Sequence, residues 1–99
     1  MAHLRAPRVD SDLDDIWYRI AKESGSLEIA DRVIESISER FYLLSRNPHI
    51  GRERDDLRLG LRVFPAGNYL IVYRIEGDDV VILYVLHGSR DIESFFRHH

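Results

Sequence analysis

Apolar residues in the first half of the chain recur at three- and four-residue intervals, and this helical spacing predicts two successive α-helices. Ser11 and Asp14 have the spacing of a capping pair, so the first helix is expected to begin near residue 11 and to end at Ser24-Gly25. Ser26 should cap the second helix, which Asn47-Pro48 ends. The two apolar stripes are Leu13, Ile16, Trp17, Ile20 and Ala21, and then Leu27, Ala30, Ile34, Ile37, Phe41 and Leu44. They predict a helix hairpin whose stripes, Trp17 included, face the core.

The apolar pattern changes after residue 60 to the composition and alternation of β-strands. Strands are expected at residues 61–64, 69–76 and 79–87, with a tight turn at Gly77-Asp78 between the last two. In the middle strand, Tyr69, Ile71, Tyr73 and Ile75 share one face, and Leu70, Val72, Arg74 and Glu76 share the other. The first face should meet the helices, whereas the second should stay partly open. Shorter elements are expected at the two ends, a strand within residues 3–9 that stops at Pro7 and a helix at 91–97.

These elements together predict an α+β fold, a two-layer sandwich in which an N-terminal strand and a helix hairpin pack on an antiparallel β-sheet. The 99 residues suffice for one domain, residues 1–99, and are too few for two. His98 and His99 are either native residues or part of a purification tag, and both are left out of the functional interpretation. No apolar run is long enough for a membrane span or a signal peptide, so a cytoplasmic protein is expected.

Charge and composition argue against several kinds of site. The chain carries 14 Lys and Arg against 17 Asp and Glu, a net charge of −3, which disfavours a uniformly basic nucleic-acid-binding surface. It has no cysteine, and His3, His49 and His87 are scattered, so neither a metal site nor a cofactor is expected. The loop at 48–60 mixes arginines with acidic residues whose charges nearly cancel, which favours internal ion pairs or a solvated surface over a nucleic-acid-binding patch.

Polar residues at the end of the last strand and along the sheet form one candidate catalytic set. Its members are Arg62, Tyr73, Arg74, His87 and Arg90. Metal-independent RNA cleavage needs an acid, a base and cations, and these residue types can supply all three. Tyr73 and Arg74 are neighbours in a strand, however, so they point to opposite faces and cannot both join one site. In the alternative interpretation, His87 and Arg90 hydrogen-bond to the backbone and fix the exit of the strand.

Five sequence segments, spread over nearly the whole chain, are informative through their order and spacing. They are Asp14-Asp15-Ile16-Trp17, residues 41–48 followed by Gly51-Arg52, Leu61-Arg62, residues 69–74 and residues 85–91. In this order they resemble the RelE/ParE toxin superfamily, and they are most similar to its ParE branch. The resemblance implies a bacterial type II toxin with two helices packed on an antiparallel sheet, neutralised by a ParD-like antitoxin encoded beside it.

The two branches of this superfamily imply different activities on one scaffold. ParE-like members inhibit DNA gyrase, whereas RelE-like members cleave mRNA on the ribosome. Two features favour the ParE side: the acidic balance of the chain, and a C-terminal end whose last aromatic residues, Phe95 and Phe96, cannot transfer protons. The resemblance thus implies a toxin that inhibits gyrase by binding and is not an enzyme.

The resemblance defines contact residues poorly, so the residues named next are a hypothesis of their own. Target contacts are expected from Arg90, Ile92, Phe95, Phe96 and Arg97. Antitoxin contacts are expected from Leu27, Phe41 and Arg74, because an antitoxin helix or extended segment should cover the helix hairpin and a sheet edge, where an apolar patch is expected. Two alternatives remain open. One is a ribosome-dependent mRNA endoribonuclease that uses His87, Arg62 and Arg90, and the other is a degenerate toxin that only binds its antitoxin as a co-repressor.

Overall fold

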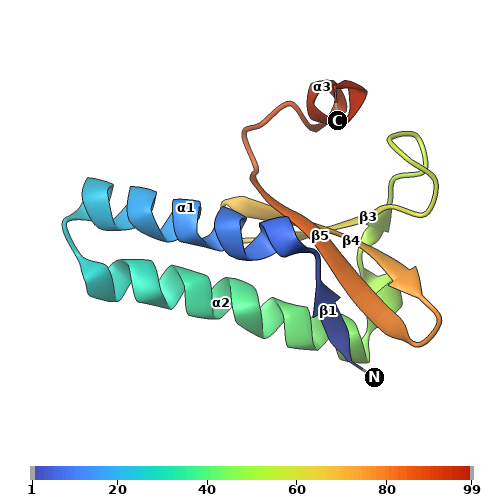
Figure 1. Ribbon diagram of the computed structural model, residues 1–99, viewed down its shortest axis with the longest axis horizontal. Coiled ribbons are helices and arrows are strands. Elements are labelled where there is room, and N and C mark those ends of the chain that lie inside the picture. Colours follow the sequence, from blue (N-terminus) through green and yellow to red (C-terminus); the bar gives the residue numbers. More distant parts are fainter. Residues whose placement is uncertain (1, 99) are drawn as a thin grey trace.

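The protein folds as an N-terminal strand, a helix hairpin, an antiparallel meander and a C-terminal helix (Figure 1). A computed structural model describes residues 2–98, so His99 lies outside the described residues. In chain order the elements are β1 (His3–Arg5), α1 (Pro7–Ser24), α2 (Leu27–Arg46), the 3-10 turn η1 (Pro48–Ile50), β2 (Arg52–Glu53), β3 (Arg62–Ala66), β4 (Tyr69–Glu76), β5 (Asp79–His87) and α3 (Ile92–Arg97). Among the described residues, no helix combines the length and the apolar character needed to cross a bilayer.

The predicted end of α1 and the predicted start of α2 are confirmed, but α1 begins earlier than predicted. Helix α1 begins at Pro7, one turn before the predicted start, and Ser11 lies inside the helix. Proline is well suited to the first turn of a helix, where its missing N–H leaves no hydrogen bond unmade. Gly25 ends α1 with a φ of 68°, and the Ser26 hydroxyl accepts the Ile29 N–H at 3.2 Å, as predicted.

The five strands form one mixed sheet in the order β1-β5-β4-β3-β2. Strands β3, β4 and β5 are the predicted antiparallel meander, and the turn between the last two has Gly77 at a φ of 60°. Strand β1, however, pairs with β5 in parallel. The predicted α+β fold with two helices on a sheet is therefore confirmed, and its sheet is mixed because of this N-terminal edge strand.

Strand β5 contains a β-bulge that the sequence did not predict. The successive pairs Val72–Tyr84 and Tyr73–Ile82 leave Leu83 as an extra residue. The side chains of β5 that face the helices are therefore even-numbered before the bulge and odd-numbered after it. Since the strand is apolar almost throughout, alternation of residue types could not reveal this change of face.

Apolar cores lie on both faces of the sheet. The larger core, between the sheet and the helix hairpin, contains Val9, Leu13, Ile16, Ile37, Phe41, Leu44, Tyr69, Ile71, Tyr73, Val80, Ile82 and Val85. The smaller core contains Leu61, Val72, Leu86, Phe95 and Phe96. Helix α3, which stands apart from the hairpin in Figure 1, therefore covers part of the face that was expected to remain open.

Trp17, predicted as a core residue, instead joins the two helices at the edge of the hairpin. Its side chain is half-buried, and its Nε1–H donates to Asp31 Oδ1 at 2.8 Å. The preceding residue Ile16 takes the buried position. A tryptophan at the edge of the hairpin can pack its ring and still hydrogen-bond its N–H. The apolar stripe contains both Ile16 and Trp17 and could not show that only Ile16 is buried.

His3 makes the stability of the fold depend on pH. Burial first, and then the charge of Arg5, lower the pKa of His3 below its ordinary value of 6.5. The unfolded chain therefore binds this proton at higher pH than the folded chain does. The stability that the fold gains from a neutral His3 is fully present above about pH 6.5. It is lost as the pH falls through the lower pKa of the folded state.

A His3→Gln variant should therefore lose less free energy of unfolding than the wild type between about pH 7.5 and about pH 5. Glutamine keeps a polar side chain on β1 but binds no proton in this range. Urea unfolding of both proteins at fixed ionic strength measures the two losses. Equal losses would show that His3 does not carry this pH dependence.

Candidate functional site

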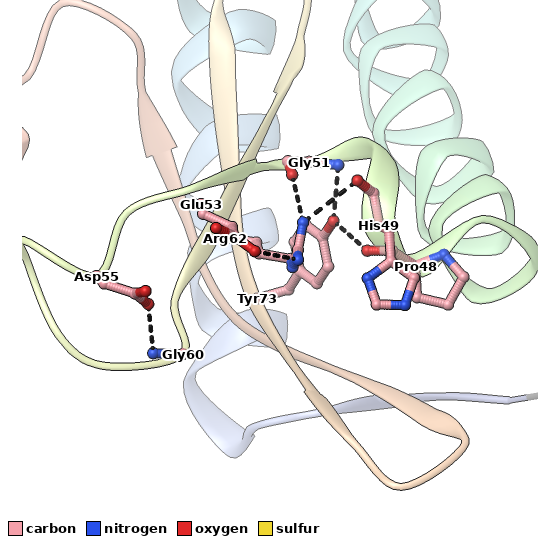
Figure 2. A network of polar contacts seen from close by, with 8 residues as sticks. All are labelled: Pro48, His49, Gly51, Glu53, Asp55, Gly60, Arg62 and Tyr73. Carbon is pink, nitrogen blue, oxygen red and sulfur yellow. Dashed lines mark hydrogen bonds and ion pairs between the residues drawn. The ribbon is translucent and has the colours of Figure 1, made fainter.

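Tyr73 anchors the chain that follows α2 to the centre of the sheet (Figure 2). Its side chain is fully buried, and its hydroxyl donates to the Pro48 carbonyl at 2.6 Å and accepts the Gly51 N–H at 2.9 Å. Burial raises the pKa of the Tyr73 hydroxyl, against smaller opposite effects of Gly51 and Arg62, so this group stays protonated at neutral pH. With both hydrogen-bond positions filled, Tyr73 acts as a structural clamp.

Arg62 holds the same segment through its guanidinium group. Nη1 donates to the carbonyl oxygens of Gly51 at 2.8 Å and His49 at 3.2 Å, and Nη2 binds Glu53 at 2.8 Å. Figure 2 shows Arg62 and Tyr73 converging on the chain around Gly51. Arg62 is thus engaged by carbonyl oxygens and a carboxylate of its own loop, as expected for a guanidinium that positions backbone.

Replacing Tyr73 with phenylalanine tests this clamp. The variant leaves the Pro48 carbonyl and the Gly51 N–H without their buried partner, and we expect the free energy of unfolding to fall by about 1–3 kcal/mol. Urea unfolding followed by circular dichroism measures the change. Tyr42→Phe is the matched control, because Tyr42 is exposed, and its effect should stay within about 0.5 kcal/mol. Equal stability of the two variants would rule out the clamp.

The structure does not bring together the three residues of the nuclease alternative. Arg62 pairs with Tyr73 across the sheet, whereas His87 pairs with Tyr69. Four residues of strand separate these two levels, a distance of about 13 Å along β4. His87 and Arg90 share one corner of the molecule, and Arg62 lies at a different level of the sheet.

His87 ends β5 at a corner that faces α1. Its Nδ1 accepts the backbone N–H of Ser89 at 3.1 Å and lies 2.7 Å from the Ser89 hydroxyl. A backbone N–H can only donate, so Nδ1 is the acceptor of this contact and Nε2 is the ring nitrogen that donates. The predicted backbone bond of His87 at the strand exit is confirmed. Arg90 differs from that prediction, because its guanidinium lies over the Phe95 ring, 4.6 Å from the ring centroid.

The expected target-binding residues fall into a buried group and an accessible group. Phe95 and Phe96 are only 4% and 8% exposed, and they pack edge-on against each other and against Tyr84. Their predicted role as direct target contacts stays a prediction, and it would require both rings to leave the smaller core. Arg90 and Arg97 are exposed and Ile92 is half-buried, so these three stay available on the surface.

The expected antitoxin-binding residues do not form one surface. Phe41 is fully buried in the larger core, so its side chain is not accessible to a partner in this structure and its contact with an antitoxin stays a prediction. Leu27 is 63% exposed at the start of α2, and Arg74 is exposed on β4 with its Nε bound to Glu76 at 2.6 Å. In Figure 1 the connection between α1 and α2 lies far from the turn that joins β4 and β5. Leu27 and Arg74 therefore belong to separate regions.

Two adjoining hollows lie beside α1, and Arg19, Tyr69 and His87 line both of them. The first, which we call the polar corner, has a volume of about 420 Å³ and is also lined by Arg8, Asp12, Asp15, Ser89 and Arg90. The second, which we call the apolar groove after its larger apolar part, has a volume of about 600 Å³ between the helix hairpin and the turn from β3 to β4. It is also lined by the apolar residues Ile20, Ile29, Val33, Ile37 and Ala66 and by the polar residues Glu23, Arg32, Ser36 and Asn68.

Sequence reasoning identified only part of the polar corner. It singled out His87 and Arg90 from the end of β5, but it missed Arg19 and the position of Tyr69 at the border of the two hollows. Arg19 is an exposed charge on a helix, and no local pattern distinguishes it from other surface arginines. Only the packing of α1 against β5 brings it to the same hollow as His87.

Comparison with known proteins gives consistent matches over nearly the whole chain. The family described as ParE toxin of type II toxin-antitoxin system, parDE, matches residues 4–92. Toxin ParE3 of Caulobacter vibrioides is 36% identical over 91 residues, covering 92% of this chain and 90% of that toxin. Toxin ParE1 of Mycobacterium tuberculosis is 26% identical over 92 residues, covering 92% and 93%. A solved structure titled chromosomal ParDE TA system from P. aeruginosa has the same fold, with a TM-score of 0.76, 22% identity and coverage of 88% and 95%.

Proposed function

The chain belongs to the ParE toxin family of type II toxin-antitoxin systems, and we propose that it inhibits DNA gyrase by binding and is neutralised by a ParD-like antitoxin. The observation that carries this proposal is the family match over residues 4–92, together with a ParE toxin that is 36% identical across 92% of the chain. Gyrase acts on chromosomal DNA, so the proposed place of action is the cytoplasm.

The position of Arg62 supports inhibition by binding over mRNA cleavage. A metal-independent nuclease needs its acid, base and cations around one phosphate group. Arg62 lies about 13 Å along the sheet from the level of His87, and its guanidinium is engaged by two carbonyl oxygens and Glu53. The net charge of −3 also suits a protein target better than a ribosomal RNA surface.

The apolar groove is the proposed site of the antitoxin. An amphipathic helix that lies in a groove places apolar side chains at regular spacing against apolar walls. The groove offers such walls, and Ile29 on its rim is 45% exposed. Leu27, two residues earlier on α2, is also exposed, but it does not line the groove and points to another side of the helix. In this proposal Ile29 and Val33 take the role first expected for the buried Phe41.

Expression without antitoxin separates the three functional alternatives. A gyrase inhibitor should arrest growth, should be rescued by the antitoxin encoded beside it, and should leave translated mRNA uncut in primer extension. The His87→Ala variant should still arrest growth, since His87 is not catalytic in this proposal. Cleaved mRNA that disappears with His87→Ala would favour the endoribonuclease, and unimpaired growth would favour a degenerate toxin that acts only as co-repressor.

A further inference from the structure

The polar corner contains four hydrogen-bond donors that lack an acceptor. They are the guanidinium groups of Arg19 and Arg90, the Tyr69 hydroxyl, and Nε2–H of His87. Within residues 2–98, which the structure describes, none of these four donors makes a hydrogen bond or an ion pair. Donors of this number around one hollow favour a ligand that brings only acceptors, which is an oxyanion.

The two acidic residues of the polar corner do not accept hydrogen bonds from these four donor groups. Asp12 binds the Arg8 guanidinium through both oxygens, at 3.0 and 3.4 Å, and also accepts the Val85 N–H at 3.1 Å, so its charge is already paired and most of its acceptor positions are used. Asp15 lines the same hollow without an ion pair to Arg19, although the two are one helical turn apart on α1. Once the Arg8–Asp12 pair cancels, two arginines face one aspartate.

The arrangement of Arg90 prepares it for such a ligand. Its guanidinium lies over the Phe95 ring, 4.6 Å from the centroid, so one face of the cation is packed. Stacking leaves the in-plane N–H groups free, and these are the groups that grip a carboxylate in a two-point contact. His87 is held equally firmly, since Ser89 occupies its Nδ1 and leaves Nε2–H for the hollow.

We propose that the polar corner binds the carboxylate of a single Asp or Glu side chain, carried by the amphipathic segment that fills the apolar groove. This inference rests on the proposed function, because the occupant of the groove is the ParD-like antitoxin. Arg19, Tyr69 and His87 line both hollows, so one segment can occupy the groove and reach the corner. A nucleic acid fits less well, because the adjoining walls include several apolar side chains and Glu23, and the chain is acidic overall.

Binding of the purified antitoxin encoded beside the gene tests this inference. Arg19→Gln and Arg90→Gln should each raise the Kd about tenfold, and the double variant about a hundredfold, because each removes a charge-assisted hydrogen bond. The matched control is the double variant Arg46→Gln and Arg97→Gln, which removes the same charge from exposed positions outside the corner and should change the Kd less than about threefold. Circular dichroism verifies that all variants are folded.

The carboxylate itself is found from the antitoxin side of the complex. Each Asp and Glu of the antitoxin is replaced in turn by Asn or Gln, and one replacement should weaken binding to the wild-type toxin but not to the Arg19→Gln and Arg90→Gln double variant. Equal affinity of the wild type and this double variant would overturn the inference while leaving the proposed function intact. If the wild-type toxin does not bind the antitoxin at all, the proposed neutralisation by this antitoxin is rejected. The antitoxin is then also rejected as the occupant of the groove and the corner. A double variant that keeps the wild-type affinity for the antitoxin but binds duplex DNA less tightly than the wild type would show that the corner binds phosphate. That result would overturn the carboxylate proposal.

Discussion

We expect Gly51→Ala to lower the free energy of unfolding by about 3 kcal/mol or more, which corresponds to a fall of about 15 °C in the unfolding midpoint. A Cβ atom at this position would lie 2.5 Å from Cε1 and 2.7 Å from Cζ of Tyr73, and closer still to its hydroxyl oxygen. The tyrosine cannot move away, because it is fully buried and its hydroxyl is bound to Pro48, the first residue of η1, and to Gly51, which directly follows η1. Thermal unfolding followed by circular dichroism measures the effect.

The requirement for glycine at this position is purely one of space. Gly51 has a φ of −71° and a ψ of 148°, a conformation that any residue adopts. Gly25→Ala is the matched control, because Gly25 has a φ of 68° and open space around its Cα, so alanine there costs only about 1–2 kcal/mol of backbone strain. Adding Tyr73→Phe to Gly51→Ala should not restore stability, since the ring carbons remain. A Gly51→Ala protein as stable as the Gly25→Ala protein would refute this reasoning.

The second large effect is expected from Phe95→Ala, which should cost about 3–5 kcal/mol of stability. Phe95 is 4% exposed, and its ring packs edge-on against Tyr84 and Phe96 beneath the guanidinium of Arg90. Alanine would leave a cavity in the smaller core and detach α3 from the sheet. Equilibrium unfolding in urea measures the loss, and Arg97→Ala on the same helix should change stability by less than about 0.5 kcal/mol.

This variant also separates the structural role of Phe95 from its first interpretation as a target contact. If Phe95 supports the sheet, toxicity should fall together with stability and should recover in part at lower temperature. A Phe95→Ala protein with the stability of the wild type but without toxicity would support the interpretation of Phe95 as a direct contact.

The helix hairpin and the meander could be predicted because their determinants are local. The helical stripes, the Ser26 cap, the left-handed Gly25 and the turn at Gly77 each act within a few residues. The start of α1 was placed too late because Pro7 was interpreted as the end of a strand. Proline fits both roles, and the choice depends on the packing of Val9, which is fully buried.

The candidate site was less predictable because its parts are distant in sequence. Arg19 and His87 meet only when α1 lies against the end of β5, and Arg62 and Tyr73 find their partners in a loop whose path has no local pattern. The sequence also does not distinguish apolar residues that bind a partner from those that fill a core. Phe41, a member of a core-facing stripe, and Phe95 are therefore also predicted as partner contacts, although both are buried.

The most direct test of the central claim is a supercoiling assay with purified gyrase, relaxed plasmid and ATP. The proposed function predicts that the purified toxin lowers the supercoiling rate at concentrations stoichiometric with gyrase, and that the antitoxin encoded beside it restores the rate. An unchanged supercoiling rate at a large molar excess of folded toxin would contradict inhibition of gyrase by this protein.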